Sequence, residues 1–246
     1  MQELQRIKNQ GRPLFPAHRG YEARQVASDS ICVGVCAEEM HSAKCIVQNE
    51  NQSRERAFIM HYALIPPMRI TLQNKADLSD ADLSALSILN AVVYPPDALA
   101  SWPGRTIEWA KRQWSVMVWS DDGSRVLAHA GVLIREARHN DREVRVGGIG
   151  GVMTHPEFRK QGYATAAVAR CVEFFREQGD IDFGLLVCVK PLLPFYASLG
   201  WQPFSGTFLV TQAGQTVPFT FNDPMTYPIK QSGELTGTID LQGPPW

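Results

Sequence analysis

Residues 152–164 of the chain are Val152-Met153-Thr154-His155-Pro156-Glu157-Phe158-Arg159-Lys160-Gln161-Gly162-Tyr163-Ala164. The run starts as the end of a β-branched strand, continues as a basic loop, and finishes with Gly-x-Ala at the start of an amphipathic helix. Such a loop leaves backbone N–H groups unpaired at a helix N-terminus, beside the cationic side chains of Arg159 and Lys160. The stretch therefore predicts an anion site, and a pyrophosphate is the anion that it suits best.

The spacing excludes two other phosphate-binding motifs. A P-loop requires Gly-Lys followed by Ser or Thr, and the stretch contains no such sequence. The upstream segment Gly147-Gly148-Ile149-Gly150-Gly151 looks like a dinucleotide motif, but its third glycine would fall at Met153. These glycines also lie within a strand pattern rather than after one, so the ligand is not expected to be a dinucleotide.

Composition narrows the class of protein. With 246 residues and 44% hydrophobic content, the chain can bury one sizeable core, or one core with an appendage. A formal net charge of -1 argues against a nucleic-acid partner, and no apolar run approaches the roughly 18 residues that cross a membrane. Five cysteines without framework spacing favour a reducing cytoplasmic location. No metal is expected. The candidate ligands are Cys32, Cys36, His41, Cys45 and His61, and they include one Cys-x3-Cys pair but no second pair of ligands with the spacing of a zinc site.

The chain divides at Pro66-Pro67. Residues 1–67 are rich in Gln, Asn, Arg and Glu without a sustained period, so we expect a weakly ordered N-terminal extension there, with Met60 or Met68 as candidate native starts. Residues 68–246 carry regular patterns and are predicted to form one α/β domain. Its expected strands are 68–72, 113–119, 125–136, 143–154, 183–189, 201–211 and 217–229. Four helices are expected. The first starts near Ser79 or Asp80, and the second is interrupted and covers 97–111. The third starts at 163–164, and the fourth covers 191–200.

Two segments, residues 159–164 and 195–201, resemble sequences of the GCN5-related N-acetyltransferase (GNAT) superfamily. Residues 159–164 match its Arg/Gln-x-x-Gly-x-Gly/Ala pyrophosphate loop, and the predicted order of elements is also the order of that superfamily. The resemblance implies a mixed, mostly antiparallel central sheet flanked by helices and splayed at the coenzyme site. It implies acetyl-coenzyme A as acyl donor, with no metal. The coenzyme contacts that it implies are Val152, Met153, Thr154, Arg159, Lys160, Gln161, Gly162, Tyr163 and Ala164.

Acetyl transfer to an amine needs a polarised thioester carbonyl, a neutral amine and a proton for the leaving thiolate. A backbone N–H near Val152 meets the first need where the strand splays, and the glycines at 147–151 either admit the pantetheine arm or mark a bulge. Residues 195–201 resemble the family's Phe-Tyr-x-x-x-Gly-Phe/Trp segment, which makes Tyr196 the expected general acid. The family's usual basic glutamate is replaced by Gly150, which leaves three unranked substitutes: Asp97, Glu108 and Glu136. His129 is expected in the core and His155 in a turn.

Within the superfamily, the chain is most similar to the aminoglycoside 2'-N-acetyltransferase group. The similarity rests on residues 128–132, on residues 195–201 and on a final tryptophan, Trp246. It implies that Gly150, Gly151 and Trp246 hold the acceptor. The predicted function is transfer of an acetyl group to a primary amine of a small molecule, with an aminoglycoside-like acceptor as one interpretation. An inactive coenzyme-binding sensor and a protein or peptide N-acetyltransferase are the alternatives, and a homodimer is one expectation for the assembly.

Overall fold

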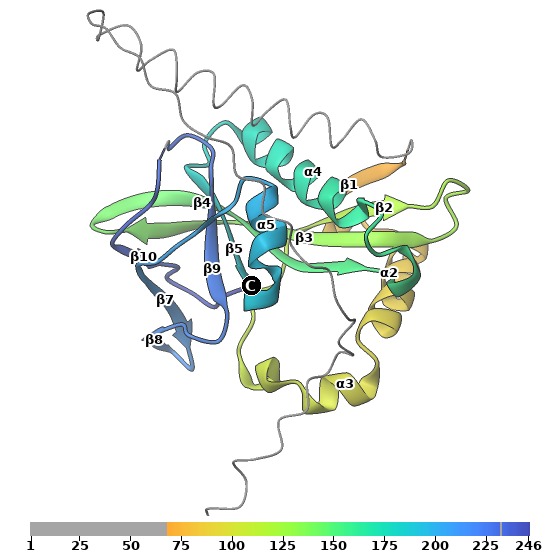
Figure 1. The fold of residues 1–246 in the computed structure, drawn as a ribbon, viewed down its shortest axis with the longest axis horizontal. Coiled ribbons are helices and arrows are strands. Elements are labelled where there is room, and N and C mark those ends of the chain that lie inside the picture. The colour runs from red at the N-terminus through yellow and green to blue at the C-terminus, as the bar shows by residue number, and fades with distance from the viewer. Residues whose placement is uncertain (1–67, 232) are drawn as a thin grey trace, which may run out of the picture. The chain divides into compact units, whose positions relative to one another are not determined.

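A computed structural model describes residues 68–231 and 233–246 (Figure 1). The predicted extension over residues 1–67 and the cysteine and histidine group considered for zinc lie outside these described residues. The described part contains one mixed sheet with helices against it, as the sequence predicted. The mixed α/β fold class is therefore confirmed.

Among the described residues, the sheet contains ten strands in the order β6-β9-β5-β4-β3-β10-β7-β8, with β2 also pairing β3 and β1 pairing β2. Only the β4–β5 and β7–β10 pairs are parallel, so the sheet is mostly antiparallel. The strands are β1 (Ile70–Asn74), β2 (Trp114–Trp119), β3 (Val126–His139), β4 (Arg142–Thr154), β5 (Phe183–Cys188), β6 (Gln202–Pro203), β7 (Thr207–Gln212), β8 (Gln215–Pro218), β9 (Asp223–Pro228) and β10 (Thr238–Asp240).

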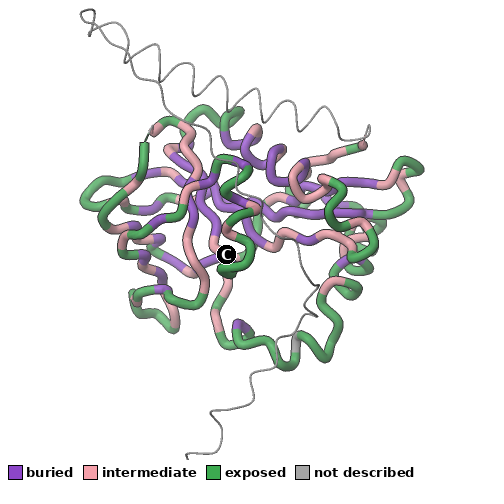
Figure 2. Tube along the Cα trace, in the orientation of Figure 1, coloured by how far each residue is buried: buried purple, intermediate pink, exposed green. Residues whose placement is uncertain are grey.

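Two long helices cover opposite faces of the sheet. α4 (Tyr163–Gln178) packs its buried side chains on β2, β3 and β4, and glycines with positive φ lie at both of its ends. α2 (Asp80–Val93) starts at a capping box in which Ser79 and Asp82 satisfy each other's backbone N–H groups. Its buried Leu89 belongs to a second cluster with Met117 and Met153. Figure 2 shows that burial is concentrated in the central strands, while α2 is largely exposed.

The interrupted helix predicted over 97–111 is much shorter in the structure. It consists of α3 (Pro96–Ser101) and a 3-10 turn, η2 (Pro103–Thr106). The helix stops because Trp102 precedes a proline, which disfavours helical backbone at that residue. The backbone of residues 107–113 then bonds to other parts of the chain, with the N–H of Ala110 donating to the carbonyl of Pro245 at 2.7 Å. Tertiary hydrogen bonds therefore replace the helical ones.

The C-terminal region also departs from the predicted strands. The runs 201–211 and 217–229 are each broken in two, as β6 and β7 and as β8 and β9. The strand β10 was not predicted, because three residues are too few for a visible alternation. It pairs with the end of β3, which continues to His139, three residues beyond the predicted end. After this pairing the chain reaches β4, where Trp246 lies against Gly148 and Gly150.

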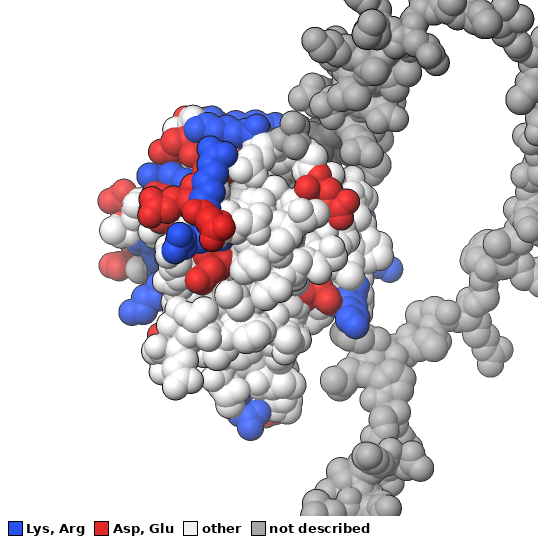
Figure 3. All heavy atoms as spheres, turned by 90° about the vertical axis from the view of Figure 1, so that its left-hand side faces the viewer, with Lys and Arg blue, Asp and Glu red and all other residues white. Residues whose placement is uncertain are grey.

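The surface of the β3–β4 hairpin carries charges of both signs. Arg145 pairs with Glu136 and with Asp180, each at 3.4 Å. On the face drawn in Figure 3, Lys and Arg side chains alternate with Asp and Glu in one area, and the rest of the described surface there is largely uncharged. No helix within the described ranges is both long and apolar enough to span a bilayer.

Candidate active site

The sheet opens between its two central parallel strands. β4 and β5 pair only from Val146 opposite Phe183 to Ile149 opposite Leu186. β4 then continues to Thr154 along β3, while β5 continues to Cys188 along β9. Residues 150–154 therefore lack a β5 neighbour, and the splay expected at this point of β4 is confirmed.

A bulge lies where the strands separate. The register between β3 and β4 shifts between His129 and Gly131, and Gly151 adopts a φ of +58°, a conformation that favours glycine. The buried His129 bridges the bulge, since its Nδ1 lies 3.1 Å from the Gly151 carbonyl and its Nε2 lies 3.3 Å from the Ser115 hydroxyl. Burial lowers the pKa of His129 to about 4, so the ring is neutral near pH 7 and can donate to the carbonyl and accept from Ser115. The core location predicted for His129 is confirmed.

Other parts of the protein pack against the glycines of this region, where a side chain on the glycine would otherwise lie. A Cβ on Gly147 would overlap Phe175, and one on Gly148 would overlap the indole of Trp246. A Cβ on Gly150 would lie 3.0 Å from the main-chain carbonyl carbon of Trp246. The glycine-rich sequence is thus explained by close packing and by the bulge. An acyl chain in the splay would contact the strand edge rather than these faces.

The basic loop has the backbone geometry of an anion site. Lys160 and Gly162 adopt positive φ values of 62° and 86°, and Gly162 caps α4 without a side-chain acceptor. The N–H groups of the first helical turn therefore point out of the helix without a partner among the described residues, beside the exposed side chains of Arg159, Lys160 and Gln161. This donor set fits a pyrophosphate.

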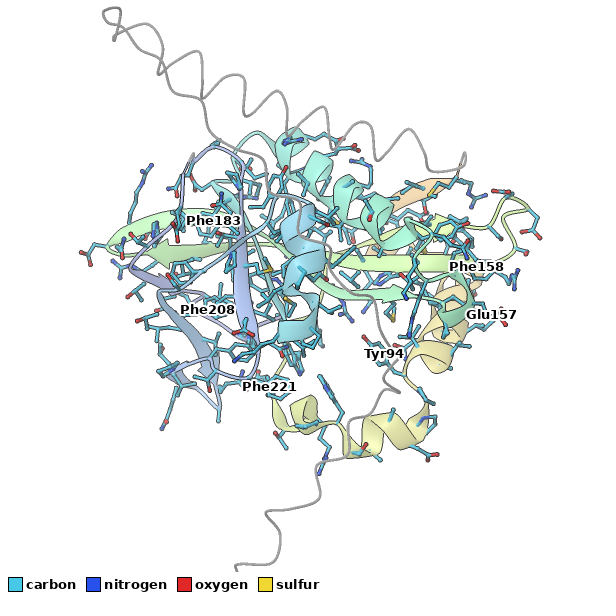
Figure 4. All side chains as sticks on the ribbon, viewed as in Figure 1. Tyr94, Glu157, Phe158, Phe183, Phe208 and Phe221 are labelled. Carbon is cyan, nitrogen blue, oxygen red and sulfur yellow. The ribbon has the colours of Figure 1, made fainter. Side chains whose placement is uncertain are left out.

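Aromatic contacts hold the loop in this shape. Phe158 packs edge-on against Tyr163 with ring centroids 6.2 Å apart, and against His155 at 5.3 Å. The Arg125 guanidinium lies 5.4 Å from the centre of the Phe158 ring. Figure 4 shows Phe158 in the loop before α4. His155 is the first residue of the turn before Pro156, as predicted.

Tyr196 lies in the short helix α5 (Leu193–Ser198), which follows β5 beyond the splay. The residue is 5% exposed, and burial raises the pKa of its phenol further above the usual value. Within the described residues its hydroxyl has no hydrogen-bond partner, while its ring contacts Phe195 and Trp201. The phenol is therefore protonated at neutral pH and available as a donor.

The three candidate bases lie in different surroundings. Glu136 is opposite Arg145 on β3, five residues beyond Gly131, or about 17 Å along the strand, so it is too far from the splay to act there. Glu108 is exposed, and its backbone N–H and carbonyl are both bound by the Gln212 side chain at 2.9 Å. Asp97 is in the exposed first turn of α3.

Two residues of the site were not identified from the sequence. Arg112 lies over the bulge, because Cβ atoms on Gly131 and Gly151 would both overlap its side chain. Burial raises the pKa of Tyr94, at the end of α2, and the nearby guanidinium groups of Arg112 and Arg159 oppose that rise (Figure 4). Tyr94 therefore lies near both Arg112 and Arg159. No local motif marks either residue, and only the glycines opposite each other in β3 and β4 hint at a covering side chain.

Within residues 68–231 and 233–246, no group of three or more His, Cys, Asp or Glu side chains could hold a metal ion. The two cysteines of these ranges, Cys171 and Cys188, are both buried and free. Burial raises the pKa of Cys188 to about 11, which keeps this thiol protonated. Among the described residues, the site presents backbone N–H groups, a phenol and guanidinium groups.

A sheet that splays beside an anion-binding helix N-terminus defines the class of GCN5-related N-acetyltransferase folds. The chain is similar to this superfamily, since the family model of the acetyltransferase (GNAT) domain matches residues 94–204. An aminoglycoside 2'-N-acetyltransferase from Mycolicibacterium fortuitum is 33% identical over 92 residues, which are 37% of this chain. The chain spans 46% of the length of that relative.

Two solved structures are similar to this chain at low identity. ElaA from Escherichia coli is 18% identical with a TM-score of 0.47, and the match covers 65% of this chain and 99% of ElaA. YhbS from the same organism, solved in complex with CoA, is 14% identical with a TM-score of 0.48, over 72% of this chain and 92% of YhbS.

Proposed function

We propose that the protein is an N-acetyltransferase that moves an acetyl group from acetyl-coenzyme A to a primary amine of a small molecule. The observation that carries the proposal is the opening of β4 from β5 after Ile149, directly beside the loop with positive φ at Lys160 and Gly162. Pyrophosphate binds to the N–H groups of residues 160–164, with Arg159 and Lys160 as counter-charges. The free edge of Val152, Met153 and Thr154 accepts the pantetheine arm as a further strand.

Different groups at the splay carry out different steps of the transfer. A backbone N–H near Val152 donates to the thioester carbonyl oxygen and stabilises the negative charge that develops there. The amine nitrogen forms the new C–N bond as the C–S bond breaks. Tyr196 donates its phenolic proton to the departing thiolate, and its raised pKa keeps that proton in place until it is needed.

The acceptor amine must lose its proton before or during attack. Gly150 brings no carboxylate, so the proton passes to water beside the Trp246 main chain, whose carbonyl carbon lies 3.0 Å from a Cβ built on Gly150. We assign Gly150, Gly151 and Trp246 to the acceptor side of the site. An aminoglycoside-like acceptor, a homodimer and a cytoplasmic location stay predictions.

A thiol-release assay with acetyl-coenzyme A tests the proposal. The full chain is incubated with aminoglycosides, small primary amines and peptides with free N-termini, and acetylated products are identified by mass spectrometry. We expect turnover of small amines. Tight coenzyme binding without turnover of any amine would favour the sensor alternative, and turnover restricted to peptides would favour the peptide acetyltransferase. Failure to bind acetyl-coenzyme A would contradict the proposal.

A further inference from the structure

Arg112 lies across a floor made of glycine backbone. Gly131 and Gly150 are opposite each other in β3 and β4, so the sites of their missing side chains face the same side of the sheet. The stem of Arg112 occupies the space over Gly131, its guanidinium lies over Gly151, and the main chain of Trp246 lies over Gly150. The Arg112 side chain and the Trp246 main chain therefore lie over adjacent glycines of β4 at the point where the sheet splays.

The chain fixes Arg112 from both sides. The N–H of Ala110 donates to the Pro245 carbonyl, and the N–H of Gln113 donates to the Val132 carbonyl, each at 2.7 Å. The side-chain oxygen of Gln113 accepts from the N–H of Ile134 at 2.8 Å. These bonds hold the backbone on either side of Arg112 to the sheet and to the C-terminal segment. The backbone that carries Arg112 is therefore fixed before any ligand arrives.

This guanidinium lacks a counter-charge among the described residues. Burial lowers its pKa, and the partner next to it is the phenol of Tyr94 rather than a carboxylate. The residue keeps enough exposed surface for a ligand to reach it. A partly desolvated cation is stabilised by an anion, and the planar guanidinium matches a carboxylate with two parallel hydrogen bonds.

We propose that Arg112 is a specificity-determining residue that binds a carboxylate of the acceptor, so that the substrate class is amino acids and similar carboxylate-bearing amines. The proposal rests on the proposed function, because it concerns the acceptor side of the same site. Adjacent residues of a strand have Cα atoms about 3.8 Å apart, so groups held over Gly150 and Gly151 are a few ångströms apart. That separation suits an amine beside Trp246 and a carboxylate on Arg112 in one small molecule. A polycationic aminoglycoside would meet the like charge of Arg112, which disfavours it.

Matched pairs of acceptors test this inference. Phenylalanine, histidine and tryptophan are compared with their decarboxylated amines and with their amides, using acetyl-coenzyme A and the full chain. For the unmodified protein we expect kcat/KM to be about 10- to 100-fold higher for the carboxylates, which is the range of a charge-assisted hydrogen bond. In Arg112→Gln the preference should vanish, and Arg112→Lys should keep part of it because it retains charge without the two-pronged geometry. Comparing ratios between variants cancels the differences in amine basicity.

The neighbouring exposed Lys111 gives a matched control. Lys111→Gln removes the same charge one residue away and should keep the preference. Thermal unfolding and coenzyme titration of Arg112→Gln and Arg112→Lys establish that each variant is folded. The inference is wrong if amines are acetylated without a preference for the carboxylate, or if Arg112→Gln leaves that preference unchanged. If no amine is acetylated, the proposed function fails, and the role of Arg112 falls with it.

Discussion

His129 Nδ1 lies 3.1 Å from the carbonyl oxygen of Gly151, and this contact joins the hydrophobic core to the bulge at the splay. The histidine is 4% exposed and its second ring nitrogen is bound by Ser115. A neutral ring satisfies both contacts, one as donor and one as acceptor. A protonated ring would carry two donors and a buried charge, so the bulge depends on the neutral form.

The stability of the fold should therefore fall in acid through His129. The folded pKa is about 4 and the unfolded value is about 6.5, so below pH 6.5 the unfolded chain binds a proton that the folded chain does not. The contribution is constant above pH 6.5 and costs up to about 3 kcal/mol as the pH falls to about 4. Denaturant unfolding at several pH values measures the slope. His129→Gln should be less stable at neutral pH, but its free energy of unfolding should depend less on pH below about pH 6.5. An unchanged pH dependence in this variant would contradict its assignment to His129.

Gly148→Ala should destabilise the fold through Trp246. Its new methyl group would overlap the indole, whose N–H donates to the Leu185 carbonyl at 3.2 Å. We expect a loss of about 1–3 kcal/mol, as for other overpacked core sites. In a Trp246→Ala background the same substitution should cost far less, because the indole is gone. Chemical denaturation of the four proteins measures the coupling, and purely additive losses would show that the two residues do not clash.

The sequence predicted the parts of the site that are local in the chain. The loop at residues 159–164 and the helix after it depend on a few neighbouring residues, and so does the short helix that carries Tyr196. Helical periodicity and glycine positions are visible at that range. The mixed sheet was predicted from the order of the elements that the GNAT resemblance implied.

The acceptor side of the site was not predictable in the same way. Arg112 meets Gly151 and Trp246 meets Gly148 across long sequence separations, and these contacts depend on the hydrogen bonds of residues 107–113 and on β10. The helix expected over 97–111 illustrates the reason. Local propensity favoured it, but the Trp102-Pro103 step and the bond from Ala110 to Pro245 override that preference.

Gly162→Ala should weaken coenzyme binding beyond its effect on stability. Gly162 and Gly179 both adopt left-handed conformations, with φ values of 86° and 74°, at the two ends of α4. An alanine at either position costs roughly 1–2 kcal/mol of stability from backbone strain. Only Gly162 belongs to the anion loop, and Gly179 has open space where a methyl group would go. Calorimetric titration with coenzyme A should show weaker binding for Gly162→Ala and unchanged binding for Gly179→Ala. Equal affinities in both variants would remove the loop from the binding site.

Tyr196→Phe should separate proton donation from binding. The phenol is buried beside the end of β5, and no described residue uses its hydroxyl, so its loss leaves the packing with Phe195 and Trp201 intact. We expect kcat to fall by about 100-fold, the lower end of what a general acid contributes, with coenzyme affinity unchanged. At high pH, the fall of kcat in Tyr196→Phe should be smaller for acyl donors whose thiolates leave without being protonated. Such donors do not need a proton from the phenol.

Tyr227→Phe is the matched control for this substitution. Its hydroxyl accepts from Arg176 at 3.3 Å and its ring also packs against Trp201, so its removal should leave kcat unchanged. A normal kcat in Tyr196→Phe would assign the phenol to packing and leave the thiolate to take its proton from water. An equal fall in both variants would indicate a general effect on the fold around Trp201. A fall confined to Tyr196, with normal coenzyme affinity, would argue against the inactive sensor, because a sensor has no turnover for the phenol to support.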